Sequence, residues 1–153
     1  PDIKNSHTMA AHLLNKLPCI NCGGNVGAAS WMILDEVLKA KRVALTGVDF
    51  SYYNDTSYVQ TQYYNDALAI FGEKNLDDFF IKIHNPYLNK EFFTDPAYLW
   101  YKNALLEMVK DGSCETYNCT NGGILFGDGI SFIDLKEYIK LCTNLNNKNQ
   151  EVN

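Results

Sequence analysis

A glycine-rich turn between two apolar segments constrains the fold of this chain more than any other feature. The turn, Gly23-Gly24-Asn25-Val26-Gly27, follows a short apolar segment at 17–21 and opens an amphipathic stretch at 25–40. A second apolar segment, Val43 to Thr46, comes next. The order strand, glycine turn, helix, strand is typical of a βαβ unit. We therefore predict an α/β fold, a three-layer Rossmann-like domain with a mainly parallel sheet.

Length and composition suit one domain. The chain has 153 residues, of which 46% are hydrophobic and 20% charged, as in ordinary globular proteins. We predict a single domain over 1–143, with a helical and aromatic-rich insertion at about 50–93 that forms a lid over the site. The polar segment 144–153 is expected to be a disordered tail. The chain begins at Pro1 without a methionine, and we expect it to be a fragment of a longer protein.

Charge and hydropathy exclude several classes of partner. The net charge is −5, and Arg42 is the single arginine among thirteen basic residues, so the clustered basic face of a nucleic-acid-binding protein is not expected. No apolar run approaches the roughly 20 residues that span a bilayer, and no signal peptide is evident. We predict no membrane partner and a cytoplasmic location. Many of the ten Tyr and eight Phe lie between 50 and 101. Such a segment either lines a ligand cleft or, as is commoner, is buried by packing or in a homodimer interface.

The cysteines allow two interpretations. Cys19 and Cys22 form a C-x-x-C pair, and Cys114 and Cys119 form a second, wider pair. Four thiolates at such spacing are compatible with zinc. The odd total of five and the position of Cys22 at the glycine turn favour buried free thiols instead. No metal ligand is therefore assigned.

Local signals predict the remaining elements. We expect helices at 6–16, 61–71 (ended by Gly72), 96–110 (capped by Thr94) and 133–142, and a strand at 115–118. The apolar segment from Leu76 to Ile83 is either helical or extended. A turn is expected at 84–87, because Pro86 disfavours a helical conformation of Asn85.

The candidate site residues follow the predicted strands. They are Gly23, Gly24, Asn25 and Gly27 after the first strand, Asp49 and Tyr52 after the second, and Asn118, Thr120, Gly122 and Gly123 after the third. Carboxyl ends of parallel strands meet at one edge, where α/β sheets bind ligands. Glycines there let backbone N–H groups approach a phosphate.

The roles of individual residues stay open at this level. Asp49 is placed to bind a ribose hydroxyl, to hold a divalent metal, to act as a base or simply to cap a turn. Asn118 either binds ligand or fixes the Asn-Gly-Gly turn that follows it. No G-x-S-x-G elbow and no Walker A lysine occur, so hydrolase and P-loop interpretations are disfavoured.

Two motifs resemble a known family. Gly24-Asn25-Val26-Gly27, followed by a helix, a strand and Thr46-Gly47-Val48-Asp49-Phe50-Ser51-Tyr52, resembles the domain of archaeal 6-hydroxymethylpterin diphosphokinase (MptE-like) and bacterial Maf motility-accessory proteins. Thr116-Tyr117-Asn118-Cys119-Thr120-Asn121-Gly122-Gly123 is similar to the later family signature. The resemblance covers about 18–52 and 113–138.

The resemblance implies a Rossmann-like fold related to sialyltransferase-type glycosyltransferases, and a nucleotide-bearing small molecule as ligand. In the Maf branch a nucleotide-activated nonulosonic acid is transferred to a flagellin hydroxyl. In the archaeal branch diphosphate moves from ATP to a pterin alcohol, with Mg²⁺. From the positions of the residues at strand ends we predict donor-phosphate contact for Gly24, Asn25 and Gly27, acceptor activation or metal binding for Asp49, and donor binding for Asn118, Gly122 and Gly123. A non-catalytic nucleotide-sugar-binding or interaction module is the alternative.

Overall fold

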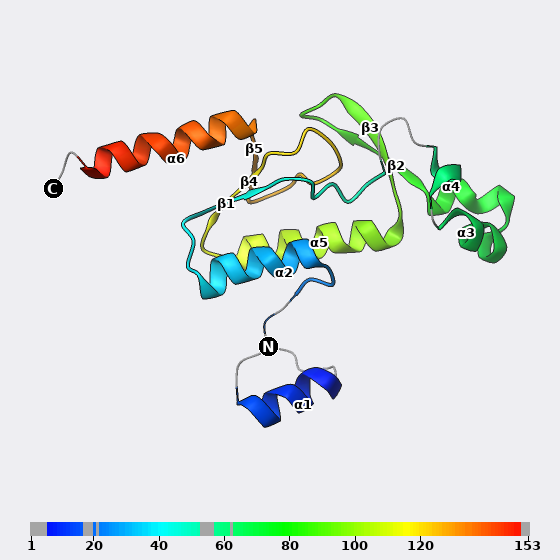
Figure 1. The fold of residues 1–153 in the computed structure, drawn as a ribbon. Helices are drawn as coiled ribbons and strands as arrows, with labels where there is room; N and C mark the ends of the chain where they lie inside the picture. The colour runs from blue at the N-terminus through cyan, green and yellow to red at the C-terminus, as the bar shows by residue number, and fades with distance from the viewer. Residues whose placement is uncertain (1–5, 17–19, 21, 53–56, 62, 151–153) are drawn as a thin grey trace.

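A computed structural model describes residues 6–16, 20, 22–52, 57–61 and 63–150 (Figure 1). Its helices are α1 (Ser6–Asn15), α2 (Val26–Met32), the π-helical η1 (Ile33–Val37), the 3₁₀ turns η2 (Tyr58–Gln60) and η3 (Glu73–Asn75), α3 (Tyr64–Phe71), α4 (Leu76–Phe79), α5 (Pro96–Asp111) and α6 (Leu135–Gln150). Its strands are β1 (Arg42–Leu45), β2 (Ile81–Asn85), β3 (Lys90–Thr94), β4 (Glu115–Asn118) and β5 (Ile130–Phe132).

A three-stranded parallel sheet of order β1-β4-β5 forms the centre of the fold. Arg42 lies opposite Glu115 and Leu45 opposite Asn118, so β1 and β4 end at the same edge. The strands predicted at 43–46 and 115–118 are thereby confirmed, whereas β5 was not predicted because it is only three residues long. The strand predicted at 17–21 lies outside the described residues except for Ile20, which belongs to no strand.

Helices α2 and α5 lie side by side along one face of this sheet (Figure 1). Asn25 starts α2, because its side-chain oxygen accepts a hydrogen bond of 2.9 Å from the Ala28 N–H. Trp31 is fully buried, and its indole N–H donates to Thr116 Oγ1 of β4 at 2.9 Å. This hydrogen bond satisfies the polar tip of a large core side chain and fixes α2 against the sheet.

The π-helical turn η1 positions a buried carboxylate. Asp35 Oδ1 accepts hydrogen bonds from Ser113 N (3.0 Å), Ser113 Oγ (2.9 Å) and Cys114 N (2.8 Å). Burial alone would raise the pKa of Asp35, but these donors stabilise the charged form and the net pKa is lowered. Asp35 therefore anchors the start of β4 to the end of the α2–η1 helix.

The segment between β1 and α5 builds a second, smaller unit. Helices α3 and α4 pack around a core of Ala67, Leu76 and Phe80, and β2 pairs with β3 in an antiparallel hairpin outside the parallel sheet. The undecided stretch is thus both helical (α4) and extended (β2). The predicted helix near 61–71 and its glycine C-terminus are confirmed, since Gly72 has a φ of +73°.

Two predicted helix ends are wrong. Asp95, not Thr94, caps α5: its Oδ1 accepts from Tyr98 N at 2.9 Å, while Thr94 ends β3 and donates to Phe50 O at 2.8 Å. Helix α6 runs to Gln150, through most of the segment predicted as a disordered tail. Once a helix is nucleated, each further residue adds a backbone hydrogen bond, which allows a polar sequence to remain helical.

The predicted α/β class is confirmed, and the three-layer Rossmann-like arrangement stays a prediction. One helix contact outside the α2–α5 pair is relevant to this arrangement: Tyr138 of α6 lies against Tyr117 of β4, with ring centroids 5.3 Å apart. Across the described ranges, no helix combines the length and apolar character needed to cross a membrane.

Candidate functional site

Two adjoining cavities lie where β1 and β4 end. The larger, of about 400 Å³, is lined by Asn25, Val26, Gly27, Gly47, Val48, Asp49, Phe50, Ser51 and Tyr98. The smaller, of about 150 Å³, is lined by Asp49, Ser51, Tyr52, Lys90, Phe92, Asn121, Gly122 and Gly123. Asp49 and Ser51 line both cavities and therefore mark their junction.

Asp49 and Ser51 each carry an unsatisfied oxygen. Asp49 Oδ1 and Ser51 Oγ are shielded from solvent and have no hydrogen-bond partner within the described ranges. Burial raises the pKa of Asp49 above its ordinary value of 3.8. A Cβ built on Gly122 would lie 3.8 Å from Asp49 Oδ1, which places this oxygen beside the smaller cavity. Buried polar atoms without partners are costly to a fold, so a ligand that supplies partners would be stabilised here.

The loops that hold these residues are fixed by backbone contacts. Gly47 N–H donates to Thr120 Oγ1 at 2.8 Å, and Ile124 N–H donates to Asp49 O at 2.8 Å. The fully buried Asn85, at the end of β2, donates from Nδ2 to Gly123 O at 2.8 Å. The loop after β1, the loop after β4 and the hairpin are thereby joined into one support for the site.

Tyr52 is held from the other side. Its hydroxyl donates to the buried Asp95 Oδ2 at 2.5 Å, and its backbone N–H donates to Phe93 O at 2.8 Å. Burial, together with the hydrogen bond to Asp95, raises the pKa of the Tyr52 phenol well above its usual range. Tyr52 therefore stays neutral and contributes a rigid wall to the smaller cavity.

Six of the predicted site residues line these two cavities: Asn25, Gly27, Asp49, Tyr52, Gly122 and Gly123. Asn25 Oδ1 is already engaged with Ala28 N–H, so this helical donor is not available to a phosphate. The other four lie elsewhere. A Cβ on Gly23 would lie 2.8 Å from Met108 Sδ, and one on Gly24 would lie 2.9 Å from Tyr101 Cε1. These two glycines allow the turn to pack closely against α5.

Asn118 and Thr120 are engaged within the protein and line neither cavity. Asn118 is fully buried, its Nδ2 donates to Leu125 O at 2.7 Å, and its Oδ1 accepts from Thr120 N at 2.9 Å. The Thr120 hydroxyl accepts from Gly47. In the structure both residues shape the loop after β4, which matches the structural alternative considered for Asn118.

Nine residues that line these cavities were not among the predicted site residues. Six of them lie within two residues of a predicted one in the sequence: Val26, Gly47, Val48, Phe50, Ser51 and Asn121. The other three come from elsewhere in the chain. Lys90 and Phe92 come from β3, and Tyr98 comes from the first turn of α5. Lys90 and Phe92 lie in the segment 50–93 that was predicted to cover the site, and this is the sequence feature that pointed to them. Sequence periodicity does not report which hairpin residues reach the edge of a separate sheet.

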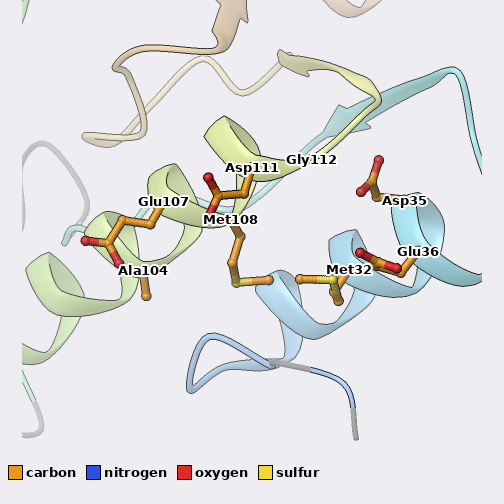
Figure 2. Close-up of a pocket in the computed structure, with 8 residues that line it drawn as sticks. All are labelled: Met32, Asp35, Glu36, Ala104, Glu107, Met108, Asp111 and Gly112. Carbon is orange, nitrogen blue, oxygen red and sulfur yellow. The ribbon is translucent and has the colours of Figure 1, made fainter. Parts of the chain in front are cut away.

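A further cavity, of about 200 Å³, lies between the α2–η1 helix and α5 (Figure 2). Figure 2 shows Met32 and Met108 pointing toward one another between these helices. The lining includes four carboxylates and no cation. Its remaining residues are Asp35, Glu36, Ala104, Glu107, Asp111 and Gly112. Such a lining repels phosphate, and the Asp35 carboxylate already accepts hydrogen bonds at the start of β4. The predicted nucleotide site is therefore not placed here.

The described residues contain no group of three or more His, Cys, Asp or Glu arranged to hold a metal. A magnesium ion that accompanies a nucleotide needs fewer protein ligands, because phosphates and waters supply the rest. Asp49, with an unpartnered buried oxygen, and Ser51 fit that requirement. Cys114 and Cys119 are buried free thiols, as predicted, whereas the free thiol of Cys22 is exposed and that of Cys142 is half-buried. Cys19 lies outside the described residues.

Comparison with known proteins found no match to this chain among family models, curated proteins or solved structures. The site is therefore interpreted from its own geometry.

Proposed function

We propose that this protein is a nucleotide-dependent transferase with a Rossmann-like three-layer fold. The proposed reaction moves a sugar of the nonulosonic-acid type from a nucleotide-activated donor to a hydroxyl acceptor. The observation that carries the proposal is the junction of the two cavities, where Asp49 Oδ1 and Ser51 Oγ are buried without partners. The junction also lies at the carboxyl edge of a parallel sheet, where α/β proteins bind ligands.

The sizes of the two cavities support separate positions for the donor and the acceptor. Ligand pockets usually enclose roughly 300–1,000 Å³, and the larger cavity, at about 400 Å³, is within that range. We assign the nucleotide-bearing donor to it. Asp49, between this cavity and the smaller one, takes the proton of the acceptor hydroxyl. Its raised pKa makes the carboxylate a stronger base than an exposed aspartate.

A second candidate is a diphosphokinase that transfers diphosphate from ATP to a pterin alcohol. The charge of the junction favours it in one respect. An Asp49 carboxylate repels nucleotide phosphates unless a cation lies between them. Mg²⁺ bound to Asp49 and Ser51 would remove this repulsion and would neutralise charge on the phosphates during transfer.

A thermal-shift panel with CMP, CDP, UDP, GDP and ATP, each with and without Mg²⁺, tests the proposal. A ligand at about a hundredfold excess over its Kd raises the free energy of unfolding by roughly 2.7 kcal/mol. Stabilisation by CMP supports sugar transfer, and stabilisation by ATP only with Mg²⁺ supports the diphosphokinase. Stabilisation by none of the five contradicts nucleotide binding and favours an interaction module.

The role of Asp49 needs a separate readout. We expect Asp49→Asn to retain nucleotide binding but to lose release of CMP from a CMP-activated nonulosonic acid. Asp128→Asn is the matched control, because Asp128 is exposed in the loop before β5, lines neither cavity and changes the net charge equally. Full activity in Asp49→Asn would remove Asp49 from the chemistry.

A further inference from the structure

The smaller cavity contains a single cationic side chain. Lys90 is the first residue of β3, is exposed, and lies opposite Asn85 in the hairpin. Its neighbours on the hairpin are paired with one another, since Lys82 Nζ lies 3.8 Å from Glu91 Oε2. Among the described residues no carboxylate forms an ion pair with Lys90. Lys90 is therefore a cavity-lining cation whose charge is not neutralised by the part of the protein that is described.

The same cavity offers a different chemistry at Asp49 and Ser51. Asp49 Oδ1 lies beside Gly122 and has no donor, and Ser51 Oγ has no partner. A carboxylate oxygen only accepts hydrogen bonds, so it is satisfied by a hydroxyl and repels an anion. An ammonium only donates and attracts an anion. One ligand satisfies all three side chains if it carries both a hydroxyl and a negatively charged group.

The volume limits what enters. A water molecule has a share of roughly 30 Å³ in the liquid, so about 150 Å³ is the space of about five waters. Covalently bonded atoms lie closer together than separate waters, so a somewhat larger number of them fills the same space. A nucleoside is too large for this space, whereas a short hydroxylated chain with one carboxylate or phosphate fits it. Neutral walls come from Tyr52 and Phe92.

We propose that the smaller cavity is the acceptor subsite and that it selects a small hydroxylated anion, with the anionic group at Lys90 and the hydroxyl at Asp49 and Ser51. The assignment of this hydroxyl as acceptor rests on the proposed transferase function. In the transfer, the acceptor O–H bond breaks and its proton goes to the Asp49 carboxylate. A new bond forms between that oxygen and the anomeric carbon, while the bond from this carbon to the donor phosphate breaks and leaves its electron pair on the nucleotide.

Calorimetric titration with three probes tests the subsite in the absence of nucleotide. sn-Glycerol 3-phosphate and glycerate carry both groups and distinguish phosphate from carboxylate, and glycerol is their neutral analogue. We expect at least one anion to bind and glycerol to bind more weakly. Lys90→Gln should weaken anion binding about fivefold, the order expected for one solvent-exposed ion pair of about 1 kcal/mol. Lys90→Arg should restore it.

Lys82→Gln is the matched control, because it removes the same charge from the neighbouring strand without lining the cavity. Equal binding of glycerol and both anions, unchanged binding in Lys90→Gln, an equal loss in Lys82→Gln, or no binding of either anion would each overturn the subsite. Nucleotide binding is measured on the same variants and should be unchanged. If the wild type does not bind nucleotide, the transferase proposal is contradicted. The anion titration then still tests, independently, whether the smaller cavity binds a hydroxylated anion.

Discussion

The backbone of Gly123 lies directly against that of Asp49. The amide that follows Gly123 donates to Asp49 O at 2.8 Å, and a Cβ built on Gly123 would lie 2.7 Å from Asp49 Cβ. Gly123 also has a φ of +77°, a backbone conformation that residues with a side chain rarely adopt. Gly122, one residue earlier, is not in that conformation, and its Cβ would have ordinary contacts with Asp49. Two adjacent glycines thus have different reasons to be glycine.

Alanine at these two positions should separate folding from binding. Gly123→Ala should lower the free energy of unfolding by roughly 2–5 kcal/mol, because it adds backbone strain to a steric clash. Gly122→Ala should change stability little and reduce the volume of the smaller cavity, so anion binding should weaken. Urea denaturation and probe titration measure the two effects. Equal destabilisation by both variants would contradict this assignment.

Asp49→Asn should stabilise the fold. Burial raises the pKa of Asp49 in the folded state above its ordinary value of 3.8. Protonated Asp49 therefore adds to the free energy of unfolding fully below pH 3.8, and this contribution is lost as pH rises through the pKa of the folded state. At neutral pH the wild type carries the cost of a buried charge, and removal of that charge should add roughly 0.5–1 kcal/mol. Thermal unfolding from pH 3 to pH 8 should show that Asp49→Asn is more stable than the wild type near neutral pH but not at acid pH. A less stable variant at pH 7 would mean that Asp49 has a structural partner.

Asp35 should behave in the opposite way. Its pKa in the folded state is lowered, so its contribution to stability is present above pH 3.8 and is lost as pH falls through the folded pKa. Asp35→Asn keeps an acceptor oxygen but removes the charge, so the three hydrogen bonds weaken and stability at neutral pH should fall by about 1–2 kcal/mol. The difference from the wild type should shrink in acid. Glu36→Gln, on the same turn but exposed, should change stability by less than about 0.5 kcal/mol.

Asn118→Asp tests whether Asn118 acts on structure. The new carboxylate has no N–H for Leu125 O and is fully buried, so stability at pH 7 should fall by about 3 kcal/mol or more. A protonated carboxyl regains a donor, and the loss should therefore be smaller at low pH. Nucleotide binding, measured below the unfolding temperature, should be retained. Loss of nucleotide binding without loss of stability would instead support the donor-binding role.

Much of the fold was predictable because its signals are local. Asn25 caps α2 through an atom three residues away, Gly72 ends α3 by its own conformation, and β1 is a short apolar run. The cap of α5 was misplaced by one residue, because Thr94 and Asp95 are both good caps and a long-range bond from Thr94 to Phe50 decided between them. Strand β5 has only three residues and is defined by its pairing with β4.

The sequence by itself determined the α/β class, the glycine turn and the position of Asp49 in the loop that follows a strand, since these depend on backbone preferences and periodicity within a few residues. Only the tertiary structure decided which polar groups stay unpaired. It satisfied Asn118 and Thr120 within the loop after β4, left Asp49 Oδ1 and Ser51 Oγ without partners, and brought Lys90 from the hairpin to the same cavity. Hydrogen bonds and charges act between groups that are close in space, and chain order does not specify that closeness.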